Sequence, residues 1–367
     1  MVFLLLISTL LTIDYPKVGI LRDRVLMDIN AVRSEVGLPP LVGDTLLDLM
    51  ATGHATYMHL NGAVGHYQEE GREGFFGSGP GDRAEYVGYP YTNIMEAIYT
   101  SDAGDFYLNA VRGLVNTLYH RLVILFPDGR DVGIGFADNI VVVNVGTTQS
   151  GTGRWALYPY PGMRNVPCQF YSDMETPDPM PDINVCGFPI TIQWGDKLAF
   201  VPEGVELYDF LGRKVDGRSF FEDGWMGFVP AEPLLPQKRY TVKAWGRIGT
   251  GDVWEKEWMF TTTSPPGMRI VHKSGDMSLS NGGRLVFIIE TVGIEQLPAM
   301  NVNFSSYDGS ALDWIAQRLR YDLAYCKQGF KVIFELPEGG PGERGVNVDF
   351  ELKADGVSVQ GTFSIPP

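Results

Sequence analysis

The sequence predicts a multidomain protein in which a domain of helices and strands is followed by two β-rich domains. Its 367 residues exceed the usual domain length of about 100–200 residues, so two or three domains are expected. Within the first 150 residues, apolar side chains recur at helical spacing in three separate runs. Beyond residue 188, short apolar runs of strand length alternate with turn residues instead.

Three helices are expected in the first domain, which we place at residues 16–150. The first spans about residues 18–35 and ends before a Gly-Leu-Pro-Pro stop. The second begins after Asp44, a residue type that caps helix N-termini, and runs to about Leu60. The third spans residues 103–119 and leads directly into His120. A histidine at the end of a buried helix can point into a cleft.

Two further segments of the first domain have other patterns. Residues 61–91 are rich in glycine and lose periodicity, which predicts a long loop with short strands and favours a functional role. Residues 132–137 and 140–145 flank the turn Asp138-Asn139 and are expected to form a β-hairpin.

Composition changes mark the remaining boundaries. Residues 151–187 are rich in proline, which removes backbone donors, so a linker or a wrapped edge is expected there rather than the core of a sheet. Residues 188–264 hold short strands at the spacing of a β-sandwich, and Ser264-Pro265-Pro266-Gly267 ends that domain. The last part, residues 268–367, is expected to be β-rich with one amphipathic helix at about residues 311–326.

The N-terminal residues 1–15 form a separate apolar segment. Its apolar core, residues 2–13, is shorter than the roughly 20 residues that a membrane-spanning helix needs, so no transmembrane span is expected. It resembles the apolar part of a secretory signal without a basic start or a clear cleavage site. We interpret it as a truncated export signal, which predicts an extracellular or cell-surface protein. A buried N-terminal segment is the alternative.

Charge and cysteine content restrict the function. A formal net charge of −15 without any basic run argues against nucleic acid as a partner. Cys168, Cys186 and Cys326 have no zinc-finger spacing. Cys168 and Cys186 flank the Pro-rich segment, so they either form a disulfide or are two small buried residues.

The first domain holds six motifs, which are, in order, N-x-x-R-x-x-x-G-L-x-P-L at 30–41, the helix ATGHATYM at 51–58, H…G…R…G-Y at 65–89, M-E-A-I at 95–98, L-V-N-T-L-Y-H-R at 114–121 and V-G-x-G at 132–135. Together they resemble the CAP superfamily, the SCP-like fold of cysteine-rich secretory proteins, antigen 5 and pathogenesis-related proteins, in its cysteine-poor bacterial branch. The resemblance covers about residues 18–147.

The resemblance implies an α-β-α sandwich whose central groove carries two histidines and two acids. Carried over to this chain, these are His66, His120 and Glu96. The second acid usually precedes the helix-borne histidine by about three turns, where this sequence has no clear glutamate. If Asn109 takes that place, a site of four residues becomes one of three.

Three interpretations of His66, Glu96 and His120 remain open. Two imidazoles and a carboxylate could hold a divalent metal such as Zn²⁺, which implies a metal-assisted hydrolase with Glu96 as general base. They could instead line a groove that binds a small apolar ligand, a peptide, a polysaccharide or a partner protein. They could also be a polar network in an envelope or adhesion module. The absent second acid favours binding or structure over catalysis, and of these we favour binding.

Neighbouring polar residues are weighed in the same way. Arg83, Glu69 and Asn109 are expected to form the wall of the groove, with Glu69 mostly solvated. Arg83 and Arg121 could clamp an anionic ligand, although pairing with loop carboxylates such as Asp82 or Glu85 is favoured. His54 lies on the apolar stripe of the second helix and is expected to be a satisfied core histidine.

One other resemblance concerns the middle of the chain. Residues 188–262, with Leu235-Pro236 before Tyr240 and a closing Trp258-Met259-Phe260 run, look like a bacterial Ig-like domain.

Overall fold

The computed structural model describes residues 15–101, 106–148, 151–249, 251–264, 267–292, 294, 298–306, 309–326, 329–341, 345–354 and 357–367. The apolar segment 2–13 lies outside these residues. The chain forms two compact units, Met1–Thr262 and Thr263–Pro367.

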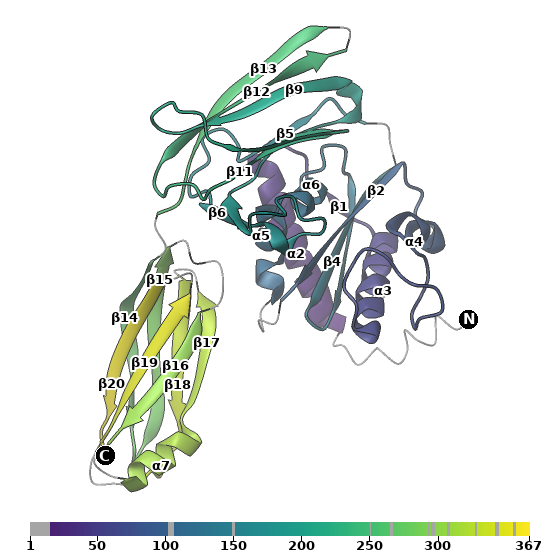
Figure 1. Cartoon of the computed structure of the whole chain (residues 1–367). Helices are drawn as coiled ribbons and strands as arrows, with labels where there is room; N and C mark the ends of the chain where they lie inside the picture. Colours follow the sequence, from purple (N-terminus) through teal and green to yellow (C-terminus); the bar gives the residue numbers. More distant parts are fainter. Residues whose placement is uncertain are drawn as a thin grey trace. The chain divides into compact units, whose positions relative to one another are not determined.

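The first domain is a four-stranded sheet between two layers of helices (Figure 1). The sheet order is β1-β3-β4-β2, with β1 parallel to β3 and the other pairs antiparallel. Helices α3 and α4 cover one face, and α2, α5 and α6 cover the other. This is the expected α-β-α sandwich. Its elements are α2 (Tyr15–Glu35), β1 (Val42–Gly43), α3 (Thr45–Asn61), α4 (Pro80–Val87), β2 (Asn93–Thr100), α5 (Phe106–Asn116), α6 (Tyr119–Ile124), β3 (Asp131–Ala137) and β4 (Ile140–Thr147).

Glycines allow α3 to lie close against the sheet. A Cβ at Gly133 or Gly135 of β3 would overlap the backbone of Leu47 or Ala51 in α3. The V-G-x-G motif is therefore explained by the approach of a helix. As predicted, the side chain of Asp44 caps α3 by accepting from the backbone amides of Leu46 and Leu47.

The first motif is explained by a buried arginine. The guanidinium of Arg33, in α2, donates to four backbone carbonyls, those of Pro39, Ile124, Phe126 and Gly129. Burial, and then the charge of Arg154, lowers the pKa of Arg33 to about 10, which leaves the side chain charged at neutral pH. Arg33 thus joins the end of α2 to the segment after α6.

Three sequence expectations differ from the structure. Of the helix expected at 103–119, residues 103–105 lie outside the described residues, and the remainder forms α5 and the start of α6, because residues 117 and 118 between them are not helical. The loop 61–91 contains the helix α4 rather than short strands, because Pro80 at its first turn and Gly88 in the left-handed region after its end favour one short helix. The helix expected at 311–326 is α7 (Gly309–Arg318), and Arg320–Cys326 instead form strand β17, which pairs with β18.

The middle domain is a seven-stranded β-sandwich whose sheets have the orders β10-β11-β8-β5 and β13-β12-β9. Taken along the chain, the first, second, fourth and fifth strands form one sheet, which is the arrangement of a constant-type Ig domain. Its first strand, β5, lies inside the segment 151–187 and forms the edge of its sheet, so this segment belongs to the sandwich as an edge and is not a linker. The strands are β5 (Trp155–Tyr158), β8 (Ile190–Trp194), β9 (Phe200–Tyr208), β10 (Gly217–Glu222), β11 (Trp225–Pro230), β12 (Arg239–Ile248) and β13 (Asp252–Thr261).

Tyr240 supports the Ig-like assignment. It is buried at the start of β12, the sixth strand, and its hydroxyl accepts from the backbone amide of Leu235 at 2.8 Å. A tyrosine that bonds back to the preceding corner at this strand is a feature of Ig-like domains.

The second unit has the same strand arrangement, which the sequence did not reveal. Its sheets have the orders β14-β15-β18-β17 and β16-β19-β20. Phe287 and Phe334 from one sheet pack against Phe350 and Phe363 from the other, with ring centroids as close as 4.8 Å. The strands are β14 (Gly267–Ser278), β15 (Gly282–Val292), β16 (Ala299–Ser305), β17 (Arg320–Cys326), β18 (Gly329–Leu336), β19 (Val346–Ala354) and β20 (Val357–Ile365).

Candidate functional site

The structure brings the three predicted site residues together from different parts of the first domain. His66 lies in the loop between α3 and α4, Glu96 lies in β2, and His120 lies in the first turn of α6. The Nδ1 atom of His66 is 3.1 Å from Oε1 of Glu96. The rings of His66 and His120 are 6.3 Å apart between centroids, at an interplanar angle of 42°.

Glu96 is the buried anchor of the site. Its side chain is 1% exposed, and both of its oxygens accept from Nη2 of Arg83 at 2.9 Å. Burial alone would raise the pKa of Glu96. The hydrogen bond from His66 and the charges of His54 and Arg83 outweigh burial, so the pKa lies below its ordinary value. Glu96 is therefore a carboxylate at neutral pH.

His54 completes the surroundings of Glu96 as a neutral, satisfied core histidine, as predicted. Its Nε2 lies 2.9 Å from the carbonyl oxygen of Gly65, an acceptor, so Nε2 carries the proton. Its Nδ1 accepts from Nε2 of Gln68 at 3.0 Å. Burial, despite the opposing charge of Glu96, lowers the pKa of His54 to about 4. Arg83 is consequently the cation that balances Glu96 at neutral pH.

His120 has a carboxylate partner that the sequence did not reveal, Glu175. The Nδ1 of His120 is 3.4 Å from Oε1 of Glu175, whose side chain is fully buried. The Oγ1 of Thr117 is 3.3 Å from the same nitrogen and donates its own proton to the carbonyl of Leu114. Both groups beside Nδ1 are thus acceptors, so the Nδ1 atom carries the proton.

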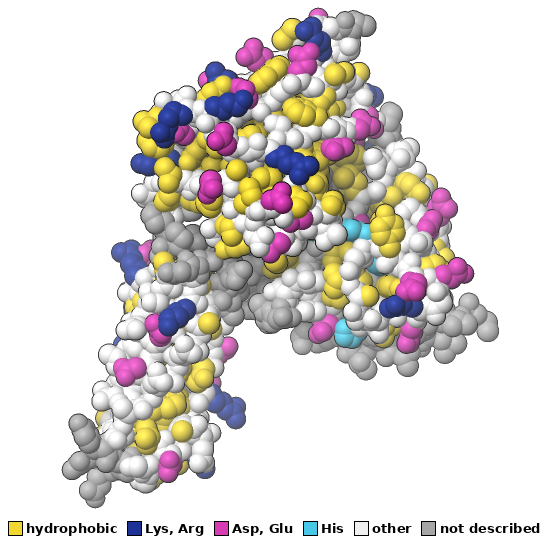
Figure 2. Space-filling view, viewed as in Figure 1, with side chains coloured by type: hydrophobic (Ala, Val, Ile, Leu, Met, Phe, Trp, Pro, Cys, Tyr) yellow, Lys and Arg dark blue, Asp and Glu magenta, His cyan; other side chains and the backbone are white. Residues whose placement is uncertain are grey.

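The two histidines therefore share one arrangement. The Nδ1 atom of His66 is hydrogen-bonded to the buried carboxylate of Glu96, and the Nδ1 atom of His120 lies 3.4 Å from the buried carboxylate of Glu175. In the neutral ring this leaves a lone pair on Nε2. The side chains are 36% and 21% exposed, so both rings are accessible to a ligand. Figure 2 shows histidine side chains at the surface of the first unit, beside apolar side chains.

The expected groove wall differs from the structure in two residues. Arg83 is buried and pairs with Glu96, rather than with Asp82 or Glu85, so it supports the site from beneath. Glu69 is exposed and forms an ion pair with Arg72 at 2.7 Å, which agrees with its expected solvation and removes it from the wall. Asn109 is half-buried in α5.

Arg121 is a structural residue. It is completely buried, and it donates to the carbonyls of Val115 and Pro189 at 2.6 Å. Its guanidinium lies 4.6 Å from the ring centroid of Tyr158 and 4.8 Å from that of Phe188. Because these aromatic residues belong to the middle domain, Arg121 joins α6 to the β-sandwich.

The donor set fits a metal only in part. Within the described ranges, no group of three or more His, Cys, Asp or Glu side chains is arranged to hold a metal ion. Both oxygens of Glu96 face Arg83, so Glu96 does not fit the predicted role of a ligand. The Nε2 atoms of His66 and His120 remain suitable, since a carboxylate on Nδ1 is the usual outer partner of a metal-binding histidine.

The structure also shows whether Cys168 and Cys186, which flank the Pro-rich segment, form a disulfide. Cys168 and Cys186 are not joined in a disulfide, and Sγ of Cys186 is 3.2 Å from the carbonyl oxygen of Ile183. Cys326 lies in β17.

Among the described helices, none is long and apolar enough to cross a membrane.

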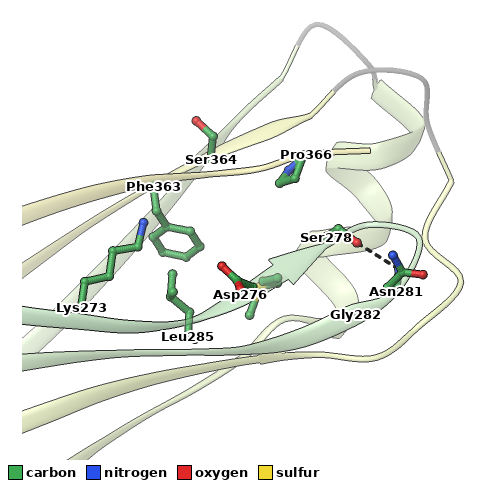
Figure 3. Close-up of a pocket in the computed structure, with 11 residues that line it drawn as sticks. Lys273, Asp276, Ser278, Asn281, Gly282, Leu285, Phe363, Ser364 and Pro366 are labelled. Atoms are coloured by element: carbon green, nitrogen blue, oxygen red, sulfur yellow. Dashed lines mark hydrogen bonds between the residues drawn. The ribbon is translucent and has the colours of Figure 1, made fainter.

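A second concave site lies in the C-terminal unit, where strands β14 and β20 meet (Figure 3). It has a volume of about 500 Å³, with Phe363 and Leu285 at its base. Lys273, Asp276 and Ser364 stand around it and are exposed. This pocket lacks the buried carboxylates that orient the two histidines, so we place the candidate site in the first unit.

Comparisons with known proteins identify what parts of the chain are similar to. The family model CAP, the cysteine-rich secretory protein family, matches residues 26–142. An extracellular protein containing an SCP domain from Bacillus anthracis is 22% identical with a TM-score of 0.31; the match covers 35% of this chain and only 40% of that protein. An outer surface protein of Borrelia burgdorferi is 20% identical with a TM-score of 0.29, covering 34% of this chain and 90% of that one. A chimeric titin Z1Z2 is 15% identical with a TM-score of 0.28, covering 49% and 86%. No curated protein matches the chain.

Proposed function

Because residues 26–142 form a CAP domain, we propose that this domain is the ligand-binding head of an exported protein, with the Nε2 atoms of His66 and His120 as its binding element. The observation that carries the proposal is the pair of imidazoles, whose ring centroids are 6.3 Å apart and whose Nδ1 atoms each lie beside a buried carboxylate. Side chains held in one orientation in the free protein lose little entropy when a ligand binds.

A divalent transition metal such as Zn²⁺ is the ion that suits this pair. Imidazole nitrogen is a preferred zinc ligand, and two rings on one tetrahedral ion lie about 5 Å apart between centroids. Small side-chain rotations would bring the observed rings to that separation. The ion would supply a Lewis acid whose other positions take oxygen or nitrogen atoms. A peptide or a polysaccharide offers such atoms, whereas a purely apolar small molecule does not.

Binding is favoured over metal-assisted hydrolysis by the state of the carboxylates. A general base must reach a water molecule or a substrate proton. Glu96 is buried with both oxygens on Arg83, and Glu175 is buried with its oxygens on backbone amides. Neither carboxylate is free to take a proton from a substrate.

The test is calorimetric titration of Zn²⁺ into the full chain and into the variants His66→Ala and His120→Ala. We expect one strong site per chain in the parent protein and loss of that site in both variants. His59→Ala is the matched control, because His59 is exposed and lies 3.8 Å from Asp138, outside the site. Equal, weak binding in all four proteins would overturn the metal proposal and would favour an envelope or adhesion module without a working groove.

Export is the second part of the proposal, and the apolar residues 2–13 support it. Residues 1–17 fused to a reporter enzyme in a bacterial host should carry the reporter out of the cytoplasm. Retention of all reporter activity inside the cell would contradict export by this segment.

A further inference from the structure

We infer that the histidine site is built by two domains, because Glu175 from the middle β-sandwich domain is the positioning residue of His120. The segment 169–187, which we call the strap, would then control whether His120 can bind. This inference rests on the proposed function for its ligand, and the experiment below separates the two.

The contacts of Glu175 are those of a fixed positioning group. Its Oε2 accepts from the amide of Leu118 at 2.9 Å, and its Oε1 accepts from the amide of Tyr119 at 2.8 Å. The same Oε1 lies 3.4 Å from Nδ1 of His120. One carboxylate therefore accepts from the backbone at the start of α6 and also lies beside the ring that this turn carries.

The strap belongs to the β-sandwich domain. Strands β6 (Gln169–Tyr171) and β7 (Val185–Gly187) pair with each other at its two ends. The hydroxyl of Ser172 donates to the carbonyl of Ile183 at 2.7 Å, and Arg218 of β10 donates to the carbonyl of Pro179 at 2.9 Å. Glu175 therefore approaches α6 on a segment that the sandwich holds in place.

An apolar contact fixes the strap against the first domain. Leu118 is fully buried in one cluster with Phe170, Met180 and Cys186 of the strap and with Phe220 and Val229 of the sandwich. Leu118 immediately precedes α6. Burial of this side chain brings the amides of Leu118 and Tyr119 to Glu175, so docking of the strap and orientation of His120 are coupled.

Glutamine cannot replace Glu175. In either orientation of its amide, the NH₂ group would face a donor, which is the amide of Leu118 on one side or Nδ1–H of His120 on the other. Either orientation loses one of these contacts and the negative charge, so Glu175→Gln should loosen the ring of His120 directly or through the turn that carries it. Loss of an outer partner of a metal-binding histidine typically weakens metal affinity about 10–100-fold.

The coupling must also act in the opposite direction. If docking of the strap favours ligand binding at His120, ligand binding must favour docking of the strap by the same factor. Zn²⁺ should consequently slow the amide hydrogen exchange of residues 169–187, although the ion itself binds in the other domain.

The experiment compares the full-length parent protein with Glu175→Gln, and with Asp173→Asn as a matched control. Asp173 is an exposed carboxylate of the same strap. Nitrogen NMR of the metal-free proteins at neutral pH reports the tautomer of His120, and Zn²⁺ titration reports affinity. We expect the Nδ1–H tautomer in the parent and in Asp173→Asn, a mixed population in Glu175→Gln, and at least a tenfold weaker Zn²⁺ site in Glu175→Gln alone.

The outcomes distinguish the two proposals. An unchanged His120 tautomer in a folded Glu175→Gln variant would overturn the positioning role, even if its melting temperature fell. A changed tautomer without Zn²⁺ binding in the parent protein would support the role of Glu175 and reject the metal as ligand. Zn²⁺ affinity equal in the parent and Glu175→Gln, with exchange of the strap unaffected by Zn²⁺, would overturn control by the strap.

Discussion

Replacement of Arg83 by methionine should expose how strongly the site depends on one buried cation. The guanidinium is completely buried, and it balances Glu96, whose side chain is 1% exposed. Removal of one partner of a buried ion pair costs about 3–5 kcal/mol, because the remaining charge stays buried without compensation. Since about 1.4 kcal/mol is a factor of ten, hydrogen exchange of amides in β2 and β4 should accelerate about 100-fold or more at pH 7.

The pH dependence of this effect has a definite sign. In the parent protein the folded-state pKa of Glu96 is lowered, so its stabilisation is present above the unfolded-state pKa and is lost as pH falls through the folded-state pKa. Without Arg83, burial should raise the pKa of Glu96 above the unfolded value. The folded variant would then take up a proton, and the stability difference between variant and parent should narrow between pH 7 and pH 5.

Two comparisons make the measurement decisive. Arg72→Met is the matched control, because Arg72 forms an exposed pair with Glu69, which is worth at most about 1 kcal/mol. The double variant Arg83→Met with Glu96→Gln removes the uncompensated charge and should be more stable than Arg83→Met alone. Exchange in Arg83→Met as slow as in Arg72→Met, or a gap that widens on acidification, would refute the reasoning.

Three further predictions concern the fold around the site. The pKa of His54 is lowered from 6.5 to about 4, so the folded state should lose roughly 3 kcal/mol of stability as pH falls from 6.5 to 4, and His54→Gln should flatten that loss in denaturation curves. Gly133→Ala should lower the melting temperature strongly or abolish folding, because a Cβ there meets the backbone of Leu47, whereas Gly153→Ala has room and should be neutral. Tyr240→Phe should cost about 1 kcal/mol in chemical denaturation through loss of the hydrogen bond to Leu235, and no change would reject its corner role.

The sequence alone predicted the structure correctly where a local pattern determines it. The cap at Asp44, the hairpin around Asp138 and the sandwich of the first domain depend on short-range signals and on six ordered motifs. The same motifs identified His66, Glu96 and His120, which do meet. The role of Arg83 was missed, because a buried arginine has no sequence signal until its partner in β2 is known.

Other features could not be predicted, because they depend on contacts distant in the chain. Glu175 lies 55 residues after His120 in a Pro-rich segment that was expected to be a linker or a wrapped edge. Strand β17 was taken for the end of a helix, since its pairing with β18 is a tertiary contact. The Ig-like arrangement of the second unit is a matter of strand order, and periodicity carries no information about strand order.

The two halves of the site differ in what holds them, and this difference has a consequence for function. His66 depends on Glu96 and Arg83, and all three lie within the first domain. Glu96 and Arg83 form a buried ion pair, and the ring of His66 above them is partly exposed. His120 depends on Glu175, which arrives from the adjacent domain and also satisfies the backbone of a six-residue helix. A ligand that needs both rings therefore senses whether the strap is docked, whereas a ligand that needs only His66 does not. Separation of the strap from α6 should thus convert a two-imidazole site into a one-imidazole site without unfolding the first half.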